Sequence, residues 1–146
     1  MTIEKINEWH KRARPEPTPE NLNVQIGCHF EEVVEMLDAI GIDGEHSFNG
    51  VFGKAREAVR ELADALKAGE LRVEIKDRQE LLDALADQVV TAVGVGHCAG
   101  MAVPLACDRV NDSNWSKYVD GYPVFKPNGK IDKGPNYKSP NLEGLY

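Results

Sequence analysis

Acidic side chains gather at helical spacing in the stretch CHFEEVVEMLDAI, residues 28–40. Its carboxylates are Glu31, Glu32, Glu35 and Asp38, and the stretch contains no Lys or Arg. Residues three and four apart share a helix face, so Glu31 and Glu32 both lie beside Glu35. Like charges at that spacing repel by roughly 0.2–0.5 kcal/mol per pair. Either water screens this repulsion or a bound cation neutralises it.

A second acidic stripe lies in a segment that is otherwise apolar. Residues 79–108 contain no Lys or Arg and are apolar on nearly all sides, which is typical of a buried helix. Glu80, Asp83 and Asp87 nevertheless recur at spacings of three and four. A buried carboxylate without a partner costs several kcal/mol or becomes neutral. These acids therefore need a positive charge from outside their own segment.

Brought side by side, the two stretches would form one cluster of carboxylates. Its members are Glu31, Glu32, Glu35, Glu80 and Asp83. A site built only from oxygen ligands suits Mg²⁺, or Mn²⁺, and not zinc. The cluster holds more carboxylates than one Mg²⁺ needs, so two or more ions are expected. Two ions can orient and activate a water while they stabilise charge on a phosphoryl group.

Two Cys-His pairs suggest zinc as an alternative metal. They are Cys28-His29 and His97-Cys98. Adjacent helix residues point about 100° apart, so neither pair readily aims both side chains at one ion. A nucleophilic Cys28 is also disfavoured, because its acidic neighbours raise the pKa of a thiol.

The elements that would position these residues are mostly helices. Apolar periodicity and capping residues predict four of them, over about residues 2–11, 21–41, 54–68 and 77–99. Pro15, Pro17 and Pro19 enforce an extended connector after the first helix. The helix over 54–68 has mixed charge, and we interpret it as a surface helix without a chemical role.

The C-terminal part of the chain has a different character. Residues 111–146 are rich in Gly, Pro, Asn, Lys and aromatic residues. Asn128-Gly129 predicts a turn, in a small hairpin between Val124 and Ile131. We expect this arm to pack on the helices or on a neighbouring subunit. The predicted fold is an all-α single domain over 1–146, with a four-helix-bundle core at about 20–108 and an irregular arm at about 109–146.

Bulk composition limits the class of protein. The hydrophobic fraction of 42% and the charged fraction of 28% are those of a soluble globular domain. No apolar run is long enough to span a membrane, and the N-terminus lacks the apolar core of a signal peptide. The net charge of −7 disfavours nucleic acid as a partner. Three cysteines without C-x-x-C spacing favour reduced thiols in the cytoplasm.

The two acidic motifs also resemble a known family. EEVVE followed by ELLD resembles the E-E-x-x-E … E-x-x-D signature of the MazG-type all-α nucleoside triphosphate pyrophosphohydrolases, which include phosphoribosyl-ATP pyrophosphohydrolase. The phrases LLDALADQVVTAVGVGH, SNWSK, GYPVF and GKIDKGPNY resemble phage and bacterial MazG-like members. The resemblance covers roughly residues 3–142. One departure is the interval of 44 residues between Glu35 and Glu80, which is longer than usual and suggests an insertion around 54–68.

The resemblance implies a reaction and a set of roles. The reaction is hydrolysis between the α and β phosphates of a nucleoside triphosphate, giving a monophosphate and pyrophosphate. Metal ligation falls on Glu32, Glu35, Glu80 and Asp83. Glu31 is the additional acid, which could hold a second ion or act as the base toward water.

The resemblance also assigns roles outside the metal ligands. Asn114 and Lys117 lie at positions expected near the nucleotide, with Lys117 as a phosphate contact. Lys133 and Tyr137 are weaker candidates for the same role. Asp87 has no ligand position and would orient a ligand or a basic residue.

Two expectations concern partners. The resemblance implies a homodimer or homotetramer, and the apolar segment at 88–107 is consistent with burial between subunits. A different class of function also fits the sequence: a non-catalytic helical bundle whose acidic patch docks a partner protein.

Overall fold

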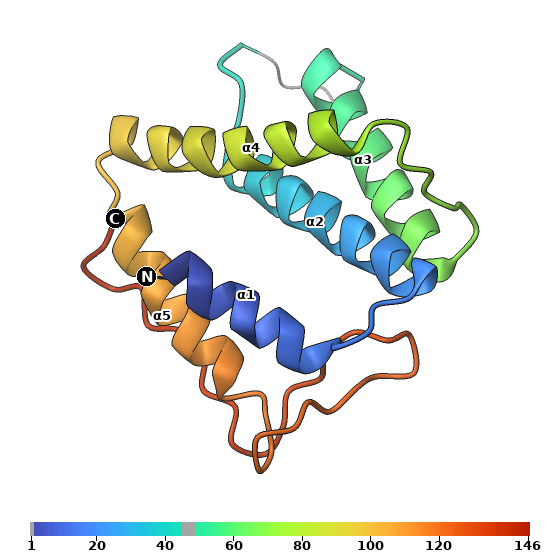
Figure 1. The fold of residues 1–146 in the computed structure, drawn as a ribbon. Helices are drawn as coiled ribbons and strands as arrows, with labels where there is room; N and C mark the ends of the chain where they lie inside the picture. The colour runs from blue at the N-terminus through green and yellow to red at the C-terminus, as the bar shows by residue number, and fades with distance from the viewer. Residues whose placement is uncertain (1, 45–48) are drawn as a thin grey trace. The chain divides into compact units, whose positions relative to one another are not determined.

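The computed structural model describes residues 2–44 and 49–146, and in this part of the chain it contains helices and no β-strand (Figure 1). Five helices are present among the described residues: α1 (Thr2–Ala13), α2 (Pro19–Ala39), α3 (Val51–Ala68), α4 (Arg78–Cys98) and α5 (Val103–Trp115). The predicted all-α class is confirmed. Part of the loop predicted between the second and third helices, residues 45–48, lies outside the described residues.

The chain forms two compact units. One comprises the described residues of 1–15, 75–126 and 131–146, and therefore contains α1, α4 and α5. The other comprises the described residues of 16–74 together with 127–130, and contains α2 and α3.

Helices α2 and α3 pack along each other in their unit (Figure 1). Thr18 begins α2 with a capping box: its hydroxyl accepts from Asn21 N, and Asn21 Oδ1 accepts from Thr18 N. The buried side chains between the helices include Val34, Ala63 and Leu66. The helices approach closely at Gly27, where an added Cβ would lie 2.9 Å from the carbonyl oxygen of Ala63.

Buried Asn23 fixes the end of this helix pair. Its Nδ2 donates to Leu66 O at 2.8 Å and to Leu71 O at 2.7 Å, and its Oδ1 accepts from Val73 N at 2.8 Å. These bonds satisfy main-chain groups just after α3 ends at Gly69, which has the left-handed φ of 74° that favours glycine. The segment 71–75 connects this helix pair to the chain before α4 and contains no helix or strand.

An aromatic cluster joins α1, α5 and the chain after α5. Trp9, Ala13 and Tyr118 are its buried members, with Trp115 and Ile131 packed against them. The Trp9 indole Nε1 donates to Asn114 O at 3.0 Å, and Tyr118 Oη donates to Trp9 O at 2.7 Å. The ring hydrogen bonds therefore fix α1 against the C-terminal end of α5.

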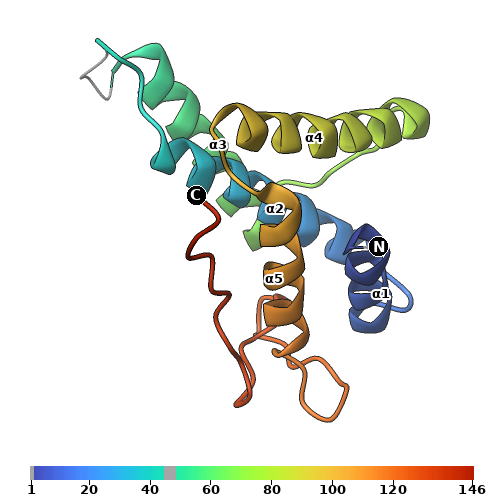
Figure 2. The same cartoon turned by 90° about the vertical axis from the view of Figure 1, so that its left-hand side faces the viewer.

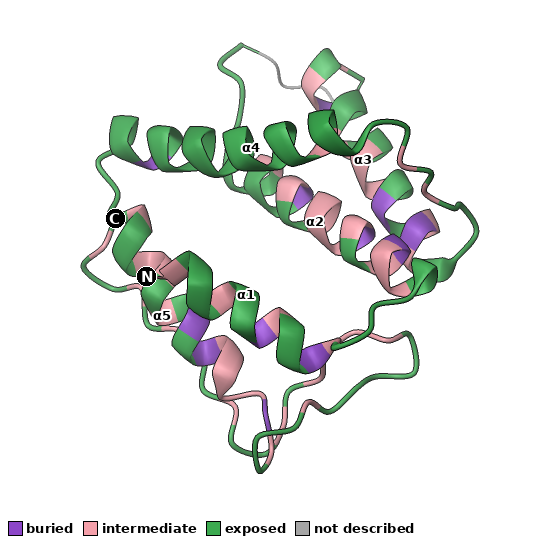
Figure 3. Ribbon diagram, viewed as in Figure 1, coloured by how far each residue is buried: buried purple, intermediate pink, exposed green. Residues whose placement is uncertain are grey.

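Helix α4 is exposed, although its apolar sequence predicted burial. Asp77 caps its first turn by accepting from Gln79 N and Glu80 N. Figure 3 shows exposed surface along nearly all of α4, and its one buried residue is Gly96. An added Cβ there would lie 2.0 Å from Val103 Cγ2, so Gly96 permits the close approach of α5. A helix with apolar residues on most sides needs another surface to cover it, and α5 covers only its end.

The C-terminal segment is less irregular than predicted at its start and contains the predicted turn. Helix α5 continues past residue 109 to Trp115. Gly129 has a φ of 81°, and Asn128 Oδ1 accepts from Lys130 N at 3.1 Å. Phe125 and Ile131 form an isolated antiparallel bridge in place of a full hairpin. The final residues of the chain return to α5, where Ala102 N donates to Leu145 O at 2.8 Å (Figure 2).

No helix in the described part of the chain is both long enough and apolar enough to cross a membrane alone. Among the described helices, the pair α4 and α5 is long and apolar enough when taken together, but the two are bent by 118° at their junction.

Candidate functional site

Basic residues of α3 neutralise one end of the acidic row on α2. The Asp38 carboxylate accepts from Arg56 Nη1 at 3.2 Å and from Arg60 Nη2 at 2.9 Å. The sequence offered water or a bound ion as the means of relieving charge repulsion. At Asp38 the structure supplies protein cations instead, from the helix that was interpreted as having no chemical role.

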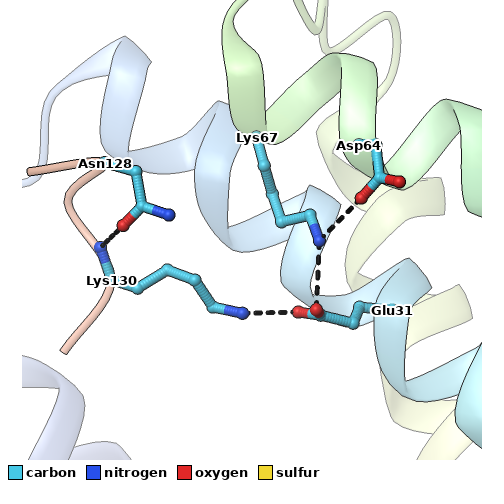
Figure 4. Close-up of polar contacts among 5 residues, drawn as sticks. All are labelled: Glu31, Asp64, Lys67, Asn128 and Lys130. Atoms are coloured by element: carbon cyan, nitrogen blue, oxygen red, sulfur yellow. Dashed lines mark hydrogen bonds and ion pairs between the residues drawn. The ribbon is translucent and has the colours of Figure 1, made fainter. Parts of the chain in front are cut away.

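The other end of the row is also ion-paired (Figure 4). Lys67 Nζ lies 3.0 Å from Glu31 Oε1 and 2.9 Å from Asp64 Oδ1, while Lys130 Nζ lies 2.5 Å from Glu31 Oε2. Lys67 comes from the last turn of α3, and Lys130 from the Asn128-Gly129 turn. The two oxygens of Glu31 therefore have one ammonium group each.

These contacts keep Glu31 ionised. Burial acts to raise the pKa of Glu31, but the hydrogen bonds and positive charges of Lys130 and Lys67 outweigh it and hold the pKa below its ordinary value. Burial acts to lower the pKa of Lys67, and the contacts with Asp64 and Glu31 outweigh it and raise that pKa. At neutral pH Glu31 and Lys67 are therefore both charged.

The acids assigned as metal ligands differ from these paired acids. Glu35 on α2 is exposed, and it has no ion pair within the described residues. Glu80 and Asp83 on α4 are likewise exposed and without an ion pair in that part of the chain. The prediction that they are buried is therefore wrong, and water can solvate their charge without a bound cation. Glu32, three residues before Glu35 on α2, is also exposed.

The predicted ligands belong to different units. Glu32 and Glu35 lie in the unit of α2 and α3, whereas Glu80 and Asp83 lie in the unit of α4 and α5. Among the residues that the structure describes, no three or more His, Cys, Asp or Glu side chains are grouped so that they could hold a metal ion. Convergence of all four carboxylates therefore stays a prediction.

The donor chemistry nevertheless fits a hard divalent cation. Glu32 and Glu35 are three residues apart on α2, and Glu80 and Asp83 are three apart on α4, so each helix presents two carboxylates on one face. Oxygen donors of this kind are those that Mg²⁺ and Mn²⁺ prefer. Asp87, predicted to orient a ligand, is exposed one turn further along α4.

Three of the four predicted nucleotide-binding residues act on one another in the C-terminal segment. Lys133 Nζ lies 4.7 Å from the centre of the Tyr137 ring. Hydrogen bonds with Ser139 and Ser113 lower the pKa of Tyr137, and the positive charges of Lys133 and Lys117 lower it further. The tyrosine oxygen thus lies in a field made by both lysines.

Lys117 and Asn114 are placed by the aromatic cluster. Lys117 Nζ lies 6.0 Å from the centre of the Trp9 ring, at the limit of a cation–π contact. Asn114 is half-buried in the last turn of α5, where its carbonyl oxygen accepts from Trp9. The sequence placed both residues in an irregular arm, whereas Asn114 belongs to a helix and Lys117 follows it directly.

A groove of about 540 Å³ lies between α5 and the final residues of the chain. Its walls are fastened by hydrogen bonds: Arg109 Nη1 donates to Asn141 O at 2.8 Å, and Ser113 Oγ donates to Lys138 O at 2.7 Å. None of the predicted site residues lines it. These contacts explain how the last segment is held on α5.

The cysteines are free thiols. Burial raises the pKa of Cys28, with Glu31 and Glu32 adding to the increase and Lys130 and Lys67 opposing it. The direction agrees with the argument against a nucleophilic thiol, although burial and not the acidic neighbours is the largest cause.

Sequence reasoning missed Lys67 and Lys130 as partners of the acidic row. The only signal was the presence of basic residues in the mixed-charge helix and beside the predicted turn, and neither signal specifies Glu31 as the acceptor. Comparison with family models, with curated proteins and with solved structures finds no match.

Proposed function

We propose that this protein is a Mg²⁺-dependent nucleoside triphosphate pyrophosphohydrolase. Water would attack the bond between the α and β phosphates, giving a nucleoside monophosphate and pyrophosphate. The observation that supports this proposal best is the division among the acids. Glu31 and Asp38 have protein cations, whereas Glu35, Glu80 and Asp83 have no ion pair within the described residues. Glu35, Glu80 and Asp83 are three of the four positions that the family resemblance assigns to metal.

The proposed ligands are Glu32 and Glu35 from α2 and Glu80 and Asp83 from α4, with Mn²⁺ as a possible substitute for Mg²⁺. A divalent ion held by carboxylates supplies positive charge to the phosphates and lowers the pKa of bound water. Asp87 would orient one of these ligands.

Glu31 is the proposed base. Its lowered pKa keeps the carboxylate ionised at neutral pH, so it can accept a proton only when water beside it has become acidic. Release from Lys67 and Lys130 would raise its basicity, because the positive charges that stabilise the anion would be gone.

The nucleotide would contact residues of the C-terminal segment. Lys117 and Lys133 carry positive charge close to Tyr137, and this favours an anionic ligand. Asn114, with an amide that both donates and accepts, is proposed to bind the base or sugar.

We also propose that the protein is a homodimer or homotetramer in the cytoplasm. The exposed apolar side chains of α4 support self-association, because large exposed apolar patches mark interaction surfaces. Among the most exposed are Leu82 at 70% and Val90 at 67%.

The same observation favours the alternative function, a helical protein that docks another protein through α4 and its acids. Hydrolysis separates the two proposals. The protein is incubated with Mg²⁺ and a panel of deoxynucleoside and ribonucleoside triphosphates, and pyrophosphate release is measured. Metal binding is followed in parallel as the rise in melting temperature with Mg²⁺ or Mn²⁺. If no nucleotide is cleaved and neither ion raises the melting temperature, the catalytic proposal is wrong and docking is favoured.

A further inference from the structure

Two lysines that are far apart in the sequence converge on one anionic group. Lys67 and Lys130 each bring Nζ to a different oxygen of Glu31, at 3.0 Å and 2.5 Å (Figure 4). All three residues lie in the same compact unit. Two ammonium groups that face the two oxygens of one carboxylate can also bind another small anion with two available oxygens. We call the site formed by Lys67 and Lys130 the anion seat.

The position of Lys67 depends on a glycine in the facing helix. An added Cβ on Gly27 would lie 2.8 Å from Lys67 Cγ, so the lysine stem crosses α2 where a side chain is missing. Glu31 is four residues later on the same helix, one turn beyond the crossing. The ammonium group therefore reaches Glu31 with its side chain only 16% exposed.

The position of Lys130 depends on a turn. Gly129 takes the left-handed φ of 81°, and the Asn128 side chain accepts the Lys130 amide. The Lys130 side chain is 33% exposed, close to the 32% of Glu31. The seat is thus partly withdrawn from water, where a charged contact is stronger than on an open surface.

We infer that Lys67 and Lys130 bind the pyrophosphate portion of the nucleotide, and that Glu31 occupies this seat in the free protein. The inference rests on the proposed function and adds to it a phosphate-binding pair. Phosphate oxygens are strong acceptors for lysine ammonium groups, and a phosphoryl group can present two oxygens as a carboxylate does. Arrival of the phosphates displaces Glu31, which is then free to act toward water or metal.

Other cationic positions are less suited to this role. Arg109, at the groove on α5, donates from Nη1 to two main-chain carbonyl oxygens and helps to hold the chain end. Lys126 pairs loosely with Asp132 at 3.7 Å, and both side chains are more than 40% exposed. Neither places two ammonium groups around one acceptor.

The test measures binding of inorganic pyrophosphate to the full chain by calorimetry, without divalent ions and at low salt. Lys67→Gln and Lys130→Gln should each weaken binding about 10-fold, the typical effect of losing a charge-assisted hydrogen bond. Glu31→Gln should strengthen binding several-fold, because the competing carboxylate is removed. Lys54→Gln is the matched control: Lys54 is exposed on α3, and its replacement should leave affinity unchanged.

A purely structural ion pair gives a different pattern. In that case the Lys67, Lys130 and Glu31 variants would melt at lower temperature but bind pyrophosphate as the wild type does, and the inference would be wrong. It would also be wrong if the wild type bound no pyrophosphate. Should Lys67→Gln fail to fold, as judged by circular dichroism, the opposite shifts of Lys130→Gln and Glu31→Gln decide the question alone.

Nucleotide hydrolysis, measured separately with Mg²⁺, distinguishes this inference from the proposed function. Lysine-dependent pyrophosphate binding without hydrolysis would contradict the function and leave the anion seat intact. Hydrolysis by the wild type, with unaltered pyrophosphate binding in both lysine variants, would contradict the seat and leave the function intact.

Discussion

Ionic partners divide the acids of α2 into two kinds. Glu31 and Asp38 contact lysine or arginine groups from α3 and from the turn at 127–130, whereas Glu35 has no ion pair among the described residues. An exposed acid flanked by other acids gains more from a cation than one that already has basic partners. Glu80 and Asp83 on α4 are likewise exposed acids without an ion pair among the described residues, so they too would gain from a cation. Metal binding is therefore expected to depend on individual acids and not on total negative charge.

Glu35→Gln and Asp83→Asn should each lower the rate of Mg²⁺-dependent hydrolysis by at least about 100-fold, because an amide is a poor ligand for a hard cation. Folding should be unaffected or slightly improved without metal, because repulsion between carboxylates is relieved. Steady-state kinetics and thermal melts measure both effects. Asp38→Asn is the matched control, since it also removes one α2 carboxylate but should retain activity. Full activity in either ligand variant would remove that residue from the metal site.

The Glu31 contacts predict how stability varies with pH. The pKa of Glu31 is lower in the folded protein than in the unfolded chain, where a glutamate titrates at about 4.3. Its contribution is therefore complete above that value and is lost as the pH falls through the lower folded pKa. Urea unfolding between about pH 6 and pH 3 should show a stability difference between wild type and Glu31→Gln that shrinks toward acid. A difference that is constant with pH would contradict the paired state.

Close approach of the helices determines the packing of α2 on α3. Gly27 is buried, and its missing side chain leaves space for Lys67 Cγ and the Ala63 carbonyl oxygen. Gly94 on α4 offers a contrast within the same chain, because nothing lies within 4 Å of an added Cβ there. Intrinsic helix propensity favours alanine over glycine by about 1 kcal/mol at both positions. If replacing one of these glycines by alanine destabilises the protein, the loss must therefore come from packing.

Gly27→Ala should destabilise the protein by about 1–3 kcal/mol, because a Cβ at 2.8–2.9 Å from its neighbours forces α2 and α3 apart. Gly94→Ala should instead stabilise α4 by up to about 1 kcal/mol. Chemical denaturation of the two variants beside the wild type gives both free energies of unfolding. Equal effects of the two substitutions would mean that the α2–α3 approach is looser than described.

Local sequence signals were sufficient to predict most helices. Gly69 and Asp77 act within one turn of the chain, so the ends that they specify can be recognised from neighbouring residues. Pro19 was predicted to lie in an extended connector, but it is the first residue of α2, because a proline fits the first turn of a helix. The ionic partners of the acids cannot be predicted in this way. The bond from Lys130 to Glu31 joins residues 99 positions apart, and no local pattern encodes such a pairing. The proposed ligand acids were identifiable by type and spacing, whereas the cationic partners of Glu31 and Asp38 required the fold.

At the scale of the whole molecule, α4 presents the largest departure from expectation. Its apolar sequence predicted burial, because a helix that is hydrophobic on most sides is normally covered. In the structure Leu82, Val89, Val90 and Val95 are each at least 48% exposed. Sequence periodicity can identify a helix whose apolar side chains should be buried, but it does not identify the surface that buries them.

Self-association is expected to cover α4. Sedimentation should show a dimer or tetramer at micromolar concentration, and Val90→Lys should shift it toward monomer, because a charge would enter an apolar interface. Val51→Lys is the control, since Val51 on α3 is 82% exposed and its replacement should not alter the assembly. A wild-type protein that is monomeric throughout the concentration range would contradict this expectation.

The most direct measurement of the proposed activity identifies the products of nucleotide cleavage. Wild-type protein and Asp83→Asn are incubated with Mg²⁺ and the nucleoside triphosphate panel, and the phosphorus products are resolved by ³¹P NMR. We expect the wild type to form equal amounts of a nucleoside monophosphate and pyrophosphate from at least one nucleotide, and Asp83→Asn to form neither. Release of inorganic phosphate and a diphosphate, or no cleavage of any nucleotide, would contradict the proposed function.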